Sequence, residues 1–173
     1  MNLFRIDNDP AVTASQLADR HVRKMVLEGA QILCTAVRLV VPMHLYDRAE
    51  LYKVAHKHHP VTRYCTSRAG ARDVLAHSLA LADEYQFRWN KQHASEAVLI
   101  RAALFIDFLP EIDIDNNLPI PPLCVDEDLR TLPDHDAYRA HLLRKYQTWK
   151  RPPLWTNRQR PEWTYEEAAT DLP

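Results

Sequence analysis

The sequence predicts a single all-α domain built around one long central helix. From Asp19 to Arg38, polar side chains recur three or four residues apart, while almost every other position is apolar or small. That is the pattern of a helix buried on most of its sides. The chain has only 2 glycines in 173 residues and contains no Asn-Gly or Asp-Gly hairpin signal. It also lacks any apolar–polar alternation of useful length, so strands are not expected.

The boundaries of the first helices follow from capping residues and prolines. Asp9 and Pro10 predict the start of a short helix that reaches Ala18. Pro42 ends the central helix, because proline cannot continue it. A further short helix is expected near Arg48–Val54.

A second long helix is expected in the middle of the chain. Pro60 begins a helical region, and Gly70 predicts a break in it. Ala71–Asn90 has the pattern of a strong amphipathic helix, on which Glu84 and Arg88 are expected to pair at the surface.

Beyond this helix the sequence predicts one more helix, then a long irregular loop, then a final helix. Ser95 is expected to cap a helix to about Phe108, completing a core of residues 1–109 or so. An acidic loop with five prolines follows at about 110–133, and a loop this long is often functional. Asp134 then caps a helix to about Lys150, and an extended arm completes the last region of the domain, about 134–173.

Composition narrows the function classes. The three cysteines, Cys34, Cys65 and Cys124, are an odd number without close pairing, which favours a reducing compartment over a disulfide framework or a cysteine zinc cluster. With so few glycines there is no Gly-rich phosphate loop. The longest apolar run, Ile32–Val41, is too short to span a membrane and contains Arg38. The N-terminus lacks a signal-peptide pattern, so we expect a soluble cytoplasmic protein without a membrane partner.

Charge is segregated along the chain although the formal net charge is −1. Residues 107–136 hold 9 acids and 1 base, whereas residues 137–160 hold 7 bases and no acid. A basic block beside an acidic one indicates specific partners more strongly than the total charge does.

The polar stripe of the central helix is the candidate site. It consists of His21, Lys24, Glu28, Gln31, Thr35 and Arg38. We interpret it as the floor of a site, with Glu28, Lys24, His21 and Gln31 as catalytic candidates, because an amine beside a carboxylate in an apolar setting suits proton transfer or imine chemistry. Gly29 costs about 1 kcal/mol relative to alanine inside a helix, which predicts a close approach by another backbone or a ligand. The alternative is a narrow solvated stripe on a core helix.

The basic block carries a nucleic-acid signal. Its basic residues alternate with aromatic residues. Basic side chains neutralise phosphates, and aromatic side chains stack on unpaired nucleobases. We predict phosphate contacts from Arg144, Lys145, Lys150 and Arg151, with stacking by Trp149 or Trp155. The alternative is that Tyr138, Leu142, Tyr146 and Trp149 form the core stripe of their helix.

Three histidines lie just before Pro60. No acid is close to them and their spacing matches no zinc signature, so neither a metal nor a cofactor is expected. We predict nucleic-acid contacts from His56 and His59, with a solvated loop as the alternative.

The segment from Leu17 to His21, followed by Glu28, resembles the N-terminal motif of the phage pyrimidine-dimer DNA glycosylase/AP-lyase family of the endonuclease V type. That family carries Leu-Ala-Asp-x-His and a catalytic glutamate nine residues after the aspartate. The resemblance implies a compact all-α fold, a DNA partner and the glutamate role for Glu28. The chain is also similar to short phage-encoded proteins of unassigned function that share Asp-Lys-His-Val-x-Lys-Met-x-Leu-Glu and a later His-Pro. The second resemblance implies the cytoplasm of a host cell as the location.

The resemblance to the glycosylase family has limits that shape the predicted chemistry. The family's nucleophile is an N-terminal α-amine exposed by methionine removal, whereas Asn2 after Met1 favours retention of the methionine. Leu27 stands where the family has an arginine. Lys24 is therefore the alternative amine for an imine.

The sequence thus predicts a DNA-acting enzyme of the glycosylase/lyase type directed at a damaged or modified base, which would be flipped out of the helix. One alternative is a transferase that hypermodifies a pyrimidine of phage DNA. Another is a binding module without catalysis, directed at a nucleic acid or at a host protein. The choice between DNA and RNA and the oligomeric state stay open.

Overall fold

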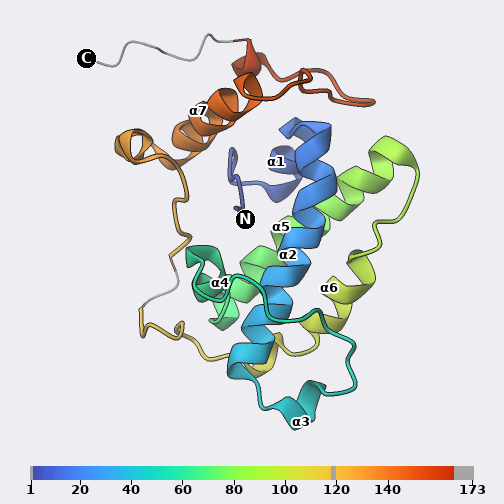
Figure 1. Cartoon of the computed structure of the whole chain (residues 1–173), viewed down its shortest axis with the longest axis vertical. Coiled ribbons are helices and arrows are strands. Elements are labelled where there is room, and N and C mark those ends of the chain that lie inside the picture. Colours follow the sequence, from blue (N-terminus) through green and yellow to red (C-terminus); the bar gives the residue numbers. More distant parts are fainter. Residues whose placement is uncertain (1, 118–119, 166–173) are drawn as a thin grey trace.

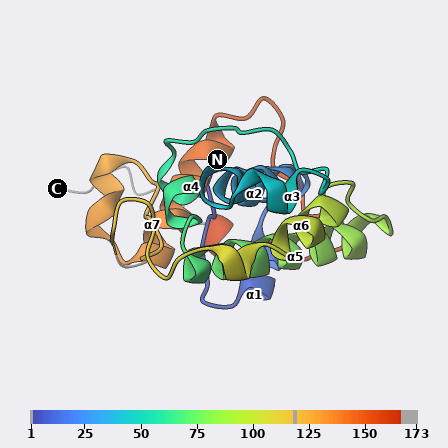
Figure 2. The same cartoon turned by 90° about the horizontal axis from the view of Figure 1, so that it is seen from below.

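Two long helices, α2 (Asp19–Val40) and α5 (Arg68–Trp89), cross at the centre of the fold (Figure 1). The computed structural model describes residues 2–117 and 120–165, and within these ranges the chain is helical with no strand. Seen from below, α5 lies between α2 and α1 (Figure 2). The remaining helices are α1 (Pro10–Gln16), α3 (Met43–Tyr46), α4 (Pro60–Tyr64), α6 (Glu96–Ala103) and α7 (Asp134–Gln147), with 3-10 turns at Ile106–Phe108, Glu127–Thr131 and Glu162–Thr164. The prediction of an all-α domain around one central helix is confirmed.

Gly29 explains how closely α2 and α5 pack. A Cβ atom on Gly29 would lie 2.0 Å from Oγ of Ser78 on α5, so no larger residue fits without movement. The glycine therefore costs helix propensity but lets the two helices approach. The close approach predicted beside Glu28 is made by α5.

Capping residues set several boundaries as expected. The Asp9 side chain accepts a hydrogen bond from the amide of Ala11, and Pro10 takes the first helical position of α1. Gly70, however, is not a break. It lies in the first turn of α5, where the Ser67 hydroxyl accepts its amide hydrogen, and the break falls at residues 65–67.

The short helix predicted at Arg48–Val54 is wrong. This segment runs without helical structure along the second half of α2. The guanidinium of Arg38 donates to the carbonyls of Leu51 and Tyr52 at 2.9 and 2.7 Å. The Thr35 hydroxyl donates to the carbonyl of Ala55 and accepts from its amide. Bonds from α2 side chains thus replace the hydrogen bonds that a helix would have made.

Glu84 and Arg88 pair as predicted, but the predicted surface location is wrong, because both side chains are buried. Arg88 is 0% exposed and lies 2.6 Å from Glu84 and 2.8 Å from Asp19. Glu84 also accepts two hydrogen bonds from Arg158, raising the pKa of that guanidinium, and Asp19 accepts from Thr156. This buried network fixes the C-terminal segment to the start of α2.

The acidic loop and the basic helix partly neutralise each other. Arg144 on α7 forms a two-pronged contact with Asp128 and lies 3.7 Å from Asp126, which also contacts His141. The Arg144 guanidinium lowers the pKa of the Asp128 carboxyl. Part of the charge segregation is therefore an internal match, which holds the segment at Glu127–Thr131 against α7. Figure 1 shows this segment beside α7.

Two further features complete the fold. Cys34, Cys65 and Cys124 are free thiols. Among the described residues, no helix is long and apolar enough to cross a membrane.

Candidate functional site

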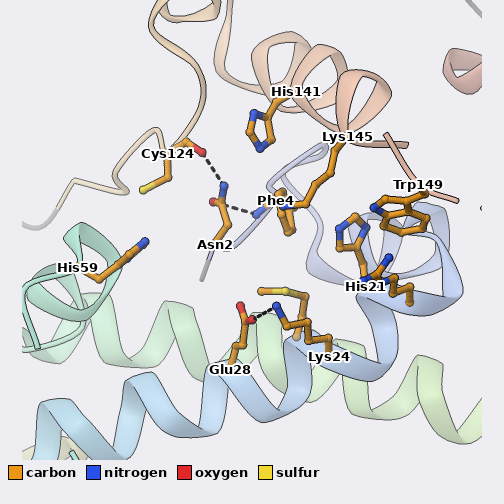
Figure 3. A pocket seen from close by; sticks show the side chains of 12 residues that line it. Asn2, Phe4, His21, Lys24, Glu28, His59, Cys124, His141, Lys145 and Trp149 are labelled. Carbon is orange, nitrogen blue, oxygen red and sulfur yellow. Dashed lines mark hydrogen bonds and ion pairs between the residues drawn. The ribbon is translucent and has the colours of Figure 1, made fainter. Parts of the chain in front are cut away.

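A pocket of about 350 Å³ opens between the first turns of α2, the start of the chain and α7 (Figure 3). These three parts are distant in sequence, so the pocket exists only in the folded protein. Its lining consists of Asn2, Phe4, Arg20, His21, Lys24, Met25, Glu28, His59, Cys124, His141, Lys145 and Trp149.

The start of the chain is held in place as one wall. The Asn2 side-chain amide donates to the carbonyl of Cys124 at 2.5 Å, and its carbonyl oxygen accepts from the amide of Leu3 at 2.8 Å. Phe4 has a φ of 43°, in the left-handed region that a side chain disfavours. This turn places the Phe4 ring against His21, and strain of this kind is often kept at functional sites.

Glu28 and Lys24 form the floor of the pocket on one face of α2. Their charged atoms lie 2.8 Å apart, with one helical turn between the residues. The Glu28 side chain is only 10% exposed, whereas that of Lys24 is 65% exposed at the rim. Among the described lining residues, Glu28 supplies the one carboxylate.

Cations surround this carboxylate. Arg20, Lys24 and Lys145 all line the pocket, and the structure gives neither Arg20 nor Lys145 an ion pair within its described ranges. Lys145 lies 5.2 Å above the Phe4 ring, and Arg20 lies 4.9 Å above the Trp149 ring. Partial removal from water lowers the pKa of the Lys145 ammonium, and Lys24 lowers it further.

His21 is a neutral imidazole at the aromatic end of the pocket. It is 3% exposed, and its ring centre lies 4.8 Å from that of Phe4 and 5.2 Å from that of Trp149. Burial lowers the pKa of His21 to about 3, helped by the charges of Lys145 and Arg20. Its Nδ1 atom finds no hydrogen-bond partner within the described structure. A buried polar atom in that state suits a ligand or a water molecule as its partner.

The arrangement can therefore bind a planar group against aromatic rings and an anionic group against cations. It can also move a proton at Glu28, and at Lys145 it offers an amine whose pKa is lowered by partial burial. Figure 3 shows Glu28, Lys24, His21 and Lys145 around one opening.

The structure brings together three of the four residues predicted as catalytic. Glu28, Lys24 and His21 line the pocket, whereas Gln31 does not. The backbone carbonyl of Gln31 accepts the hydroxyl of Thr35, one turn further along α2. The predicted polar stripe is thus divided, and only its first half reaches the pocket.

The residues predicted to contact nucleic acid divide in a similar way. His59, Lys145 and Trp149 line the pocket, and Lys150 and Arg151 line an adjoining groove. Nδ1 of His59 also accepts the amide of Val61, which caps α4. His56 is exposed in the preceding loop, with a φ of 51°.

Trp155 and Arg144 do not lie where their predicted roles require. Trp155 is 9% exposed and its indole donates to the carbonyl of Gln16, so its ring is not open to a base. Arg144 is engaged by Asp128. The alternative interpretation of α7, a core stripe on the helix, holds for Tyr138, Leu142 and Tyr146, which are buried.

Sequence reasoning missed several lining residues. Arg20 and His141 carried a local signal: Arg20 precedes His21, and His141 lies one helical turn before Lys145 on α7. Asn2, Phe4 and Cys124 carried none, because only long-range packing brings them to α2.

The Met1 amine, considered as a nucleophile from the family resemblance, lies outside the described residues. Within the described ranges, no group of three or more histidines, cysteines or acids is arranged to hold a metal ion.

None of the protein-family models, curated proteins or solved structures compared with this chain matches it. Function is therefore inferred from the chemistry of the pocket.

Proposed function

We propose that this protein is an enzyme that acts on one nucleotide of DNA, with the base of that nucleotide flipped into the pocket. The observation that carries the proposal is the single described carboxylate of the lining, Glu28, set among amines and beside aromatic rings. Recognition of a nucleotide needs cations for phosphate and rings for the base, and reaction at it needs a proton donor or acceptor.

The size of the pocket agrees with a flipped nucleotide. About 350 Å³ lies at the lower end of the volumes typical of small-molecule sites. Such a space is large enough for one base with its sugar. The rings of Phe4, His21 and Trp149 pack against one another and form one wall on which the base would stack.

The reaction we propose first is base excision with lyase activity. An unprotonated amine attacks C1′ of the sugar, the glycosidic bond breaks, and the base leaves with its bonding electrons and takes up a proton. The sugar ring then opens: the C1′–O4′ bond breaks, the nitrogen loses a proton and O4′ takes one up. The imine formed in this way between amine and sugar allows the strand to be cut by elimination. Glu28 would stabilise the positive charge that develops on the sugar and transfer the protons.

Lys145 is the better placed of the two described lysines to serve as the amine. Lys24 is held at 2.8 Å from Glu28, so its ammonium is engaged in an ion pair. Lys145 has a lowered pKa and no ion pair in the described structure, so more of it is unprotonated at neutral pH.

Borohydride trapping on a single DNA strand with one abasic site tests this reaction. Reduction would convert the imine into a stable amine, and peptide mapping would find the adduct at Lys145. Lys145→Arg should abolish the adduct, while Lys24→Arg should keep it. If DNA binds at the pocket but neither lysine nor the N-terminal amine is trapped, the lyase reaction is wrong.

A second reaction is favoured by the surplus of cations over carboxylate in the lining. Arg20, Lys24 and Lys145 face a single described acid, which suits an anionic leaving group better than a cationic transition state. A transferase that builds a group onto an activated pyrimidine would release such an anion. The mass of the DNA product separates the two reactions, because excision removes the mass of a base and transfer adds mass.

A further inference from the structure

A second concave surface adjoins the pocket. It is a groove of about 790 Å³ between the start of α2 and the segment that follows α7. Arg20, Lys145 and Trp149 belong to both hollows, so the groove leads directly out of the pocket.

The charge of this groove is almost entirely positive. Five of its lining residues are bases, from Arg20 and Arg23 on one wall to Lys150 and Arg151 on the other. Its one described acid, Asp19, is engaged by Arg88 at 2.8 Å and by the Thr156 hydroxyl at 2.6 Å.

None of the five groove bases takes part in an ion pair within residues 2–117 and 120–165. Other bases of the C-terminal segment are satisfied by the protein itself. Arg144 contacts Asp128, Arg158 contacts Glu84, and Arg160 donates to Thr164. The bases of this segment without such a partner, Lys145, Lys150 and Arg151, line the groove together with Arg20 and Arg23, and an extended anion would complement them.

We propose that the groove holds the sugar–phosphate backbone of a single DNA strand that runs out of the pocket. This inference rests on the proposed function, because it takes the pocket nucleotide as the start of the strand. Basic side chains spaced along both walls can neutralise successive phosphates, whereas a single phosphate would need only one cluster of basic side chains. Trp149, shared by both hollows, lies where the next base can stack.

The lower part of the groove favours deoxyribose over ribose. Pro152, Pro153 and Leu154 are apolar, and the Leu154 side chain is 66% exposed. A 2′-hydroxyl placed against these side chains would lose its hydrogen bonds to water without replacement. The Asp19 carboxylate, which could accept from such a hydroxyl, is already occupied.

The test measures binding of a fluorescent ten-residue oligothymidylate by anisotropy across a range of salt concentrations. Lys150→Gln/Arg151→Gln removes two groove charges. Lys53→Gln/Arg72→Gln removes two exposed charges from other surfaces and serves as the matched control; Arg72 pairs with the exposed Asp107, so its loss costs little stability.

We expect the groove variant to bind at least about 10-fold more weakly at low salt, with the slope of log K against log salt reduced by roughly 1.4, as for two lost phosphate contacts. The control variant should match the wild type. Thymidine 5′-monophosphate, which reaches only the pocket, should bind both variants equally.

Equal affinity and slope in the groove variant and the control would overturn the proposal. Equal binding of a duplex would overturn the single-strand assignment, and equal binding of oligouridylate would overturn the sugar preference. If the monophosphate fails to bind while the oligonucleotide binds and depends on Lys150 and Arg151, the pocket function fails and the groove stands.

Discussion

The two halves of the polar stripe on α2 have the same pattern in sequence but opposite positions in the structure. In the first half, His21, Lys24 and Glu28 face a pocket. In the second half, Thr35 and Arg38 are bonded to the backbone of the segment at residues 51–55. Polar residues on a buried helix therefore signal either a site or a covered segment, and the deciding factor is whether the chain itself returns to satisfy them.

Replacement of Glu28 gives the largest expected effect and tests the first half. Glu28→Gln keeps the shape of the side chain but removes the charge and the proton transfer. We expect the single-turnover rate on DNA to fall by about 10²- to 10⁴-fold, with little change in the free energy of unfolding. Full activity in this variant would show that Glu28 takes no part in the reaction.

Replacement of Arg38 tests the second half and should have the reverse profile. Arg38→Ala removes hydrogen bonds to Leu51 and Tyr52 and the contact above the Tyr46 ring. We expect a loss of about 2–3 kcal/mol in the free energy of unfolding, measured with urea, with activity retained at temperatures where the protein stays folded. A loss of activity without a loss of stability would contradict the division of the stripe.

Acid should weaken the protein through its buried histidines. Burial lowers the pKa of His21 and of His77 to about 3, below the usual value near 6.5. Between these two pH values the two histidines are protonated in the unfolded chain but not in the folded one. The free energy of unfolding therefore falls as the pH drops below about 6.5, and these histidines do not change it above that pH.

Each histidine contributes a slope of up to about 1.4 kcal/mol per pH unit in this range. Urea unfolding at pH 7.0 and at pH 5.5 measures this change in the free energy of unfolding. His21→Gln and His77→Gln are each expected to remove about half of the pH dependence. A wild-type stability that does not change between these pH values would show that neither imidazole is held neutral.

Much of the fold could be predicted because its signals are local. The Asp9 cap, the extent of α2 and the close approach at Gly29 all follow from neighbouring residues and helical spacing. Gly70 misled the analysis, since a glycine in the first turn of a helix gives the same sequence signal as a break. Here the carbonyl of Tyr64 would lie 2.1 Å from a Cβ atom at Gly70.

The candidate site could be predicted only in part. His21, Lys24 and Glu28 share a face of one helix, which spacing reveals. Lys145 was predicted as a phosphate contact, and its place opposite Glu28 depends on the docking of α7 over α2, which no local pattern records. The same holds for the burial of Arg88 and Trp155 in the network and packing that fix the C-terminal segment.

The most direct test of this account is an NMR titration of the ¹⁵N-labelled protein with thymidine 5′-monophosphate. Binding at the pocket should shift the amides around His21, Glu28 and Lys145, and leave those around Thr35 and Arg38 unchanged. Shifts along the whole length of α2, or shifts confined to other surfaces, would contradict the claim that only the first half of its polar stripe forms the site.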